Sequence, residues 1–291
     1  MDGVTLLAPA KLNLTLDVTG VQEDGYHTMD MLMQAVSLYE RVTVRRAEKL
    51  RVSAPGAALP LGPKNVAWKA AAAFFQQTGL LAGAEIRLEK RAPVRAGMGG
   101  GSADAAAVLM GLDLVYGARL SLGELCRIGQ EVGADVPFAL AGGTARVRGF
   151  GEQITPLPPL PDCLFVVCMP GYGISTPQAF AAYDQVGADA RPDNEGAERA
   201  VRAGDLAALC PCLGNALQRA SAGRDTGRIC RLLTGSGAKA ALMTGSGAAV
   251  YGLFTGARAA QQGVTALRAA GFDRVWTLVP AATGPIVEEI F

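Results

Sequence analysis

The sequence predicts an α+β fold that is divided into two domains. Strand-like and helix-like segments follow one another without the regular alternation of a doubly wound parallel sheet, which favours the α+β class. The chain has 291 residues, and at roughly 150 residues per domain its length suits two domains. Four prolines within residues 156–161 interrupt regular structure. We therefore predict an N-terminal domain at residues 1–158 and a C-terminal domain at residues 159–291.

In the first half, the strongest pattern is an alternation of apolar and polar residues at 11–18, which predicts a strand. Its core face would carry Leu12, Leu14, Leu16 and Val18, and its other face Lys11, Asn13, Thr15 and Asp17. Further strands are predicted at residues 41–46, 84–89 and 142–148. Helices are predicted at residues 65–77, at residues 103–116, and from the N-cap Ser121 to about residue 132.

In the second half, an apolar run at residues 164–169 predicts a buried strand. Several helices are expected between residues 177 and 232, although residues 184–232 carry no motif. Strands are predicted at residues 240–243, 249–254 and 274–279, with a helix at 257–270.

The composition disfavours several classes of protein. The 27 basic and 26 acidic side chains leave a net charge of +1 without the basic cluster of a nucleic-acid binder. The apolar run at residues 163–169 is far shorter than the ~20 residues that cross a bilayer. Residues 4–10 are too short and Asp2 is wrongly charged for a signal peptide. We therefore expect a cytoplasmic protein that needs no nucleic acid, membrane or obligate protein partner.

Cysteine and histidine usage limits the possible chemistry. The six cysteines fit no zinc spacing, so we expect reduced thiols. With His27 as the single histidine, histidine-based metal sites and Ser-His-Asp catalysis are both disfavoured.

The most informative segment is residues 95–107, Arg-Ala-Gly-Met-Gly-Gly-Gly-Ser-Ala-Asp-Ala-Ala-Ala. Four glycines lead directly into an alanine-rich helix, for which Ser102 is the expected N-cap. Glycines let backbone amides approach an anion, and the helix N-terminus adds partial positive charge, so the segment predicts a phosphate site. It matches neither the Walker loop nor the dinucleotide fingerprint. The alternative is a flexible linker before a helix.

Three further segments contain candidate polar residues. Residues 9–14 read Pro-Ala-Lys-Leu-Asn-Leu, and a turn at residues 24–25 places Tyr26 and His27 after it. In Gly-Ala-Asp-Val-Pro-Phe at residues 133–138, Pro137 favours an extended Val136 and fixes Asp135 in a turn. Residues 245–247 form a Gly-Ser-Gly turn before an apolar strand.

Each of these residues has an ordinary structural interpretation when it is considered alone. Lys11 could be a solvated strand lysine, Tyr26 a residue at the core edge and His27 a surface residue. Asp135 could simply cap a helix or complete a turn, and the turn around Ser246 could be only a turn.

Together, however, the four segments resemble the kinase superfamily of galactokinase, homoserine kinase, mevalonate kinase and phosphomevalonate kinase, the GHMP kinases. The shared motifs are the Pro-Ala-Lys-x-Asn-Leu strand, the central Gly-Gly-Gly-Ser-Ala loop and the Gly-Ser-Gly loop. Asp-Gly-Tyr-His at residues 24–27 and Gly-Ala-Asp-Val-Pro at residues 133–137 are similar to the branch that acts on 4-diphosphocytidyl-2-C-methyl-D-erythritol. The resemblance extends from residue 8 to about residue 254 and implies a ribosomal-S5-like N-terminal domain and a ferredoxin-like C-terminal domain.

The resemblance also implies a reaction and its residues. ATP would phosphorylate the 2-hydroxyl of that compound, in the non-mevalonate isoprenoid precursor pathway. Asp135 would be the general base and Lys11 its electrostatic partner, keeping Asp135 ionised. The ATP phosphates would contact Pro93, Val94, Arg95, Ala96, Gly97, Met98, Gly99, Gly100, Gly101, Ser102 and Ala103.

The remaining implied contacts concern the two nucleosides. Asn65 and Lys90 would lie near the adenosine, and Asn13 would orient the substrate. Tyr26 and Phe180 would stack on the two sides of the cytosine, and His27 would form a hydrogen bond with it. Mg²⁺ is implied by ATP but its ligands stay unassigned, since Asp104 suits a first-turn position better.

Two alternatives remain open. One is another small-alcohol kinase of the superfamily, of the homoserine or mevalonate type, which would lack a nucleobase clamp. The other is a nucleotide-binding module without catalysis, which would need neither Lys11 nor Asp135.

Overall fold

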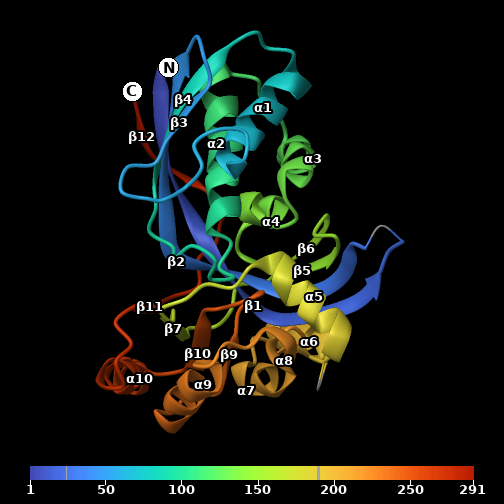
Figure 1. Cartoon of the computed structure of the whole chain (residues 1–291), viewed down its shortest axis with the longest axis vertical. Coiled ribbons are helices and arrows are strands. Elements are labelled where there is room, and N and C mark those ends of the chain that lie inside the picture. The colour runs from blue at the N-terminus through green and yellow to red at the C-terminus, as the bar shows by residue number, and fades with distance from the viewer. Residues whose placement is uncertain (24, 189–190) are drawn as a thin grey trace.

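The computed structural model describes residues 1–23, 25–188 and 191–291, which contain two β-sheets (Figure 1). Most strands of the first sheet come from the first half of the chain, and all strands of the second come from the second half. The first sheet has the order β12-β1-β2-β4-β3, with β5 beside β2, β6 beside β5 and β8 beside β1. The second has the order β11-β7-β10-β9. None of the described helices is long and apolar enough to cross a membrane.

The first sheet is built on a long antiparallel pair, β1 (Gly3–Val21) and β2 (His27–Ala47). The predicted strand at 11–18 is therefore only the middle of β1. The other strands of this sheet are β3 (Arg51–Ser53), β4 (Gly83–Glu89), β5 (Thr144–Gly149), β6 (Gln153–Leu157), β8 (Gly214–Asn215) and β12 (Ile286–Ile290). The pairing of β1 with β2 shifts in register along its length. As a result β2 pairs with β5 at residues 29–34 and with β4 at residues 41–47.

Four helices form a second layer beside this sheet: the first, second and fourth of them contact its strands, and the third packs against the other helices (Figure 1). They are α1 (Val66–Thr78), α2 (Gly100–Tyr116), α3 (Leu122–Val132) and α4 (Val136–Ala141). The fully buried alanines of α2 bring its backbone close to the sheet. As predicted, Ser121 caps α3, and Glu124 completes a capping box.

Two predicted details of these helices are wrong. Helix α2 begins at Gly100, not at Ala103, and its N-cap is Gly99 rather than Ser102. Gly99 adopts a left-handed conformation with φ of 68°, so the glycines themselves form the first turn. Val136 is not extended but is the first residue of α4. Pro137 is tolerated in the first turn of this helix, because the N–H that proline lacks would have no partner within the helix there.

The second sheet has the antiparallel topology of a ferredoxin-like fold. Its strands are β7 (Leu164–Cys168), β9 (Ala240–Met243), β10 (Val250–Phe254) and β11 (Val275–Leu278). Its helices are α5 (Thr176–Val186), α6 (Asn194–Ala203), α7 (Leu206–Leu209), α8 (Gln218–Ser221), α9 (Thr226–Gly235) and α10 (Ala257–Ala269), with a 3₁₀ turn at Cys210–Cys212. All six cysteines are free thiols.

The change of sheet occurs between β6 and β7, in the proline-rich segment that separates residues 1–158 from 159–291. The end of the chain departs from this division, because β12 pairs with β1 of the first sheet. Residues 286–290 therefore extend the N-terminal sheet and do not belong to a separate C-terminal unit. That the two parts are independent domains stays a prediction.

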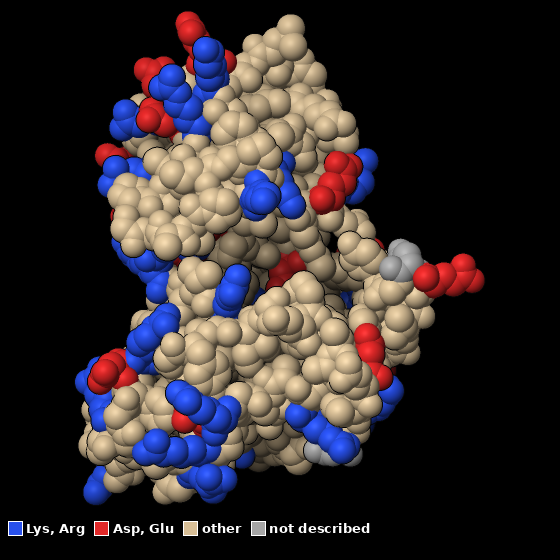
Figure 2. All heavy atoms as spheres, viewed as in Figure 1, with Lys and Arg blue, Asp and Glu red and all other residues tan. Residues whose placement is uncertain are grey.

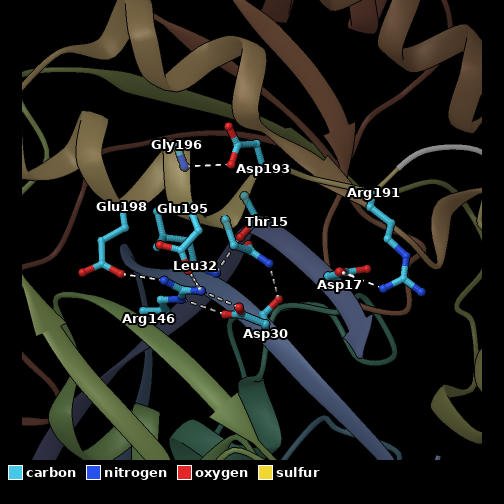
Figure 3. A network of polar contacts seen from close by, with 11 residues as sticks. Thr15, Asp17, Asp30, Leu32, Arg146, Arg191, Asp193, Glu195, Gly196 and Glu198 are labelled. Carbon is cyan, nitrogen blue, oxygen red and sulfur yellow. Dashed lines mark hydrogen bonds and ion pairs between the residues drawn. The ribbon is translucent and has the colours of Figure 1, made fainter. Parts of the chain in front are cut away.

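A network of ion pairs joins strands of the first sheet to helix α6 of the second half (Figure 3). The buried guanidinium of Arg146 on β5 contacts Asp30 on β2 at 2.6 Å and both Glu195 and Glu198 on α6, at 2.7 and 2.8 Å. These hydrogen bonds raise the pKa of Arg146. Because the Arg146 guanidinium bonds both to Asp30 of β2 and to the two glutamates of α6, it holds α6 against β2.

Candidate active site

A cavity of about 1260 Å³ lies between the two halves, and the glycine-rich loop, β1 and α5 contribute to its wall. Figure 2 shows the hollow between the upper and lower parts of the molecule, with basic side chains at its rim and acidic atoms in its depth. The predicted catalytic pair Lys11 and Asp135 and the predicted substrate residues Asn13, Tyr26, His27 and Phe180 line this cavity. So do Asn65, Lys90 and residues 92–102.

The glycine-rich loop is held between the two halves by backbone contacts. The amide of Lys11 donates to the carbonyl of Met98 at 2.9 Å, and the amide of Ala249 donates to that of Ala96 at 3.1 Å. Arg95 has a positive φ of 56°, and its carbonyl accepts from the amide of Ile174 at 3.2 Å. The loop is thus anchored to β1 and to two loop positions of the second half.

The N-terminus of α2 faces the cavity, since Gly100, Gly101 and Ser102 all line it. The first amides of a helix have no carbonyl partner within that helix and carry partial positive charge. The arrangement can therefore bind an anion such as a phosphate. A flexible linker is excluded here, because these glycines belong to a regular helix and its cap.

Lys11 and Asp135 meet beside this helix terminus. The Lys11 Nζ lies 2.5 Å from Asn13 Oδ1 and 3.6 Å from Asp135 Oδ2. The Lys11 side chain is only 8% exposed, so it is not the solvated lysine of the alternative interpretation. Asp135 is at the N-cap position of α4, yet its described contacts include no side-chain cap hydrogen bond. Its carboxylate instead faces Lys11 and is 30% exposed.

The predicted nucleobase residues gather at another part of the cavity. The rings of His27 and Phe180 lie 4.6 Å apart between centroids, tilted by 32°. Tyr26 is 68% exposed and meets Phe150 edge-on at 6.3 Å. Asp24, the first residue of the Asp-Gly-Tyr-His motif, lies outside the described residues. The cluster can offer stacking surfaces to a planar group, while its role stays a prediction.

The two predicted adenosine contacts have partners within the protein. Asn65 caps α1, because its Oδ1 accepts from the amide of Ala67 at 2.8 Å and its Nδ2 donates to the carbonyl of Pro60 at 2.7 Å. Lys90 is buried, and its Nζ lies 2.7 Å from Glu40 Oε1 and 2.5 Å from Asp104 Oδ2. Both residues therefore shape the cavity wall with polar groups that are already bonded.

Asp104 does not occupy the expected first-turn position, because α2 begins at Gly100, and its side chain is buried in this wall. Burial raises the pKa of its carboxyl to about 7, and the Glu40 charge adds to this shift while Lys90 opposes it. The Lys90 ammonium on Asp104 makes this carboxylate a poor ligand for a metal cation. Among the described residues, no group of three or more His, Cys, Asp or Glu side chains could hold a metal ion.

Sequence reasoning missed several polar residues of the cavity. Thr176, at the start of α5, shares a hydrogen bond of 2.9 Å with Ser246 in the Gly-Ser-Gly loop. Asp184 contacts His27, and its position four residues after Phe180 on a helix could have indicated a shared face. Glu40, which is buried behind the cavity wall, had no sequence signal either, because its contact with Lys90 joins residues 50 positions apart.

Comparison with known proteins places the chain in a family. A model of the GHMP kinases N terminal domain matches residues 65–143, and a model of the GHMP kinases C terminal domain matches residues 197–273. A homoserine kinase from Cytophaga hutchinsonii superposes with a TM-score of 0.80 over 99% of this chain and 98% of its own, at 18% identity. That similarity shows the fold alone. The chain belongs to the GHMP kinases.

Proteins of higher sequence identity identify the branch of the GHMP kinases to which the chain belongs. A relative from Pelotomaculum thermopropionicum named 4-diphosphocytidyl-2-C-methyl-D-erythritol kinase is 41% identical, over 89% of this chain and 92% of its own. A crystal structure of a 4-(cytidine 5'-diphospho)-2C-methyl-D-erythritol kinase matches with a TM-score of 0.78 at 34% identity, over 96% of this chain and 99% of that one. Within the GHMP kinases, the chain is thus a member of the 4-diphosphocytidyl-2-C-methyl-D-erythritol kinase family.

Proposed function

We propose that this chain transfers the γ-phosphoryl group of ATP to the 2-hydroxyl of 4-diphosphocytidyl-2-C-methyl-D-erythritol, a step in isoprenoid precursor synthesis by the non-mevalonate route. The observation that carries this proposal is the meeting of three groups in one cavity. These are the helix terminus of the glycine-rich loop, the Lys11–Asp135 pair and the aromatic cluster around His27. We place the reaction in the cytoplasm.

The glycine-rich loop would hold the ATP phosphates. Phosphoryl transfer depends on positioning and charge neutralisation more than on covalent chemistry. Backbone amides at the start of α2, fixed by the anchored loop, supply both without moving during the reaction. Mg²⁺ would neutralise phosphate charge and would come with the nucleotide, since the described residues offer it no cage of their own.

Asp135 would take the proton of the attacking hydroxyl as general base. Its carboxylate is partly exposed to the cavity and is free of capping hydrogen bonds among the described contacts, so it can reach a substrate. Lys11, 3.6 Å from it, would stabilise negative charge as it develops on the substrate oxygen. Asn13 holds the Lys11 ammonium at 2.5 Å and so keeps it in place.

The aromatic cluster would bind the cytidine. Tyr26 and Phe180 offer faces for stacking on a base, and His27 offers a ring nitrogen for a hydrogen bond. A kinase of homoserine or mevalonate would have no use for such a cluster. This makes the cluster the feature that favours a nucleotide-linked alcohol over a free one.

The test is an ADP-release assay with Mg-ATP on the purified chain, offering the cytidyl alcohol, homoserine and mevalonate in separate reactions. We expect turnover with the cytidyl compound alone. Turnover with homoserine or mevalonate would reject the role of the aromatic cluster in binding a nucleobase. ATP binding without ADP release with any of the three alcohols would instead indicate a non-catalytic nucleotide-binding module.

A further inference from the structure

His27 and Asp184 form a close contact at the edge of the cavity. The Nε2 atom of His27 lies 2.7 Å from Oδ1 of Asp184 on α5. The His27 side chain is 9% exposed, whereas Asp184 is 48% exposed. Phe180 and Tyr183 of the same helix pack on the histidine ring, with centroids at 4.6 and 6.4 Å. One helix thus fixes both the plane of the ring and the partner of one of its nitrogens.

This contact decides which ring nitrogen carries the proton. An ionised carboxylate only accepts hydrogen bonds, so Nε2 of His27 must be the donor. In a neutral imidazole the other nitrogen, Nδ1, then has a lone pair and can only accept. Without Asp184 the two tautomers would compete, and Nδ1 could act as either donor or acceptor.

The two common pyrimidines differ at the group that such a nitrogen would meet. Cytosine has an exocyclic amino group, which donates, where uracil has a carbonyl oxygen, which accepts. An Nδ1 acceptor pairs with the amino group, whereas two acceptors facing each other leave both unpaired. A binding site that loses a hydrogen bond in this way discriminates strongly.

We propose that Asp184 is a positioning residue that makes the site select cytosine over uracil, by holding His27 in the tautomer with its proton on Nε2. This inference rests on the proposed function, because it assigns the nucleobase to the cluster around His27. It extends that proposal to a residue that does not itself touch the base.

The direct test is nitrogen NMR of the histidine ring. Because the chain contains one histidine, a tag-free preparation gives the signals of His27 alone. At alkaline pH, where free imidazole is neutral, we expect the Nε2–H tautomer in the unchanged protein. In Asp184→Asn the amide can donate to Nε2, so the Nδ1–H form should increase. The matched control is Gln185→Ala at the next, exposed position of α5.

The functional test compares binding of cytidine 5'-diphosphate and uridine 5'-diphosphate by calorimetry. We expect Asp184→Asn to reduce the preference for the cytidine compound at least about tenfold, the effect of roughly one net hydrogen bond. Asp184→Glu should restore part of the preference, and Gln185→Ala should keep it all. The KM for ATP should not change in any of these variants.

Two results would overturn the inference: an Nδ1–H tautomer in the unchanged protein, or an Asp184→Asn variant with an unaltered preference for cytidine 5'-diphosphate. Failure of the proposed function would look different. The tautomer and the nucleotide preference would then behave as expected, while the cytidyl alcohol gave no ADP.

Discussion

The backbone of Gly97 lies so close to the carbonyl oxygen of Thr244 that no Cβ atom fits between them. Gly245 is packed in the same way, because a Cβ on it would lie 2.7 Å from the carbonyl oxygen of Gly97. The glycine-rich loop of the first half therefore rests directly on the Gly-Ser-Gly loop of the second. These two segments, 147 residues apart, form one unit at the floor of the cavity.

This contact predicts that Gly97→Ala will disturb the phosphate site. Gly97 has a φ of 74°, so alanine would add backbone strain to the overlap with Thr244. We expect a loss of stability of about 1–3 kcal/mol and a raised KM for ATP. Urea unfolding and steady-state kinetics measure the two effects. The control is Gly123→Ala on α3, outside the cavity, where a Cβ meets only the hydroxyl oxygen of Ser121, at 4.0 Å. Equal behaviour of the two variants would contradict the prediction.

Asp135→Asn should preserve the fold and remove the proposed base. Because the Asp135 side chain caps no helix among the described contacts, unfolding in urea should be nearly unchanged. Turnover should fall by at least about a hundredfold, while ATP affinity stays close to that of the unchanged enzyme. Asp205→Asn, which retains a helix cap outside the cavity, is the matched control. Normal turnover in Asp135→Asn would remove Asp135 from the mechanism.

Lys11→Met should reduce turnover through loss of the buried ammonium. Methionine keeps most of the aliphatic stem that packs against Gly99, so the loop should remain in place. The loss of a preorganised charge beside the reacting oxygen should lower kcat by roughly 10²–10³. Single-turnover kinetics measure this step directly. Lys64→Met removes an exposed charge from the cavity wall and should have a much smaller effect. Comparable losses in both variants would indicate a general effect of charge.

Tyr26→Ala should weaken binding of the cytidyl substrate. The exposed ring offers a stacking face worth about 1–3 kcal/mol per base, so its removal should raise KM about tenfold or more with little change in kcat. Tyr26→Phe keeps the ring and should behave like the unchanged enzyme. Substrate titrations distinguish the two variants, and an unchanged KM in Tyr26→Ala would reject stacking by this residue.

The stability of the chain should depend on the protonation of Asp104. Burial raises the pKa of its carboxyl from 3.8 in an ordinary setting to about 7 in the fold. Between these values the folded state binds a proton that the unfolded state does not, so this group lowers stability as the pH rises. Relative to the unchanged protein, Asp104→Asn should therefore gain stability from about pH 4 to about pH 7. Urea unfolding across this range measures the difference, and a constant difference would argue against a raised pKa.

The sequence predicts best those parts of the fold that local signals determine. The strands at residues 240–243 and 249–254 and the cap at Ser121 follow from apolar runs and from side-chain chemistry within one turn. The length of β1 and β2 could not be found in this way. Both faces of β1 are buried, so Lys11 and Thr15 occupy what an alternating pattern would present as a solvent face.

In the candidate site, too, the sequence predicts the residues of local motifs better than the contacts that depend on tertiary packing. The motifs around Lys11, Gly97 and Asp135 are contiguous, and the structure brings them into one cavity. The bonds of Lys90 to Glu40 and Asp104 depend on tertiary packing, and no single segment contains their signal. The position of Lys90 near the adenosine, which the resemblance implies, stays a prediction, and the structure adds two carboxylate partners for its ammonium.

The pairing of β12 with β1 affects the order in which the molecule can be assembled. The edge of β1 at residues 4–7 binds residues 286–290, so the first sheet closes only after the whole second sheet has been synthesised. Until then β1 exposes unpaired backbone groups, which can recruit a strand from another chain. Contacts of such long sequence separation also slow folding. The sheet that carries Lys11 is thus begun first and completed last during synthesis.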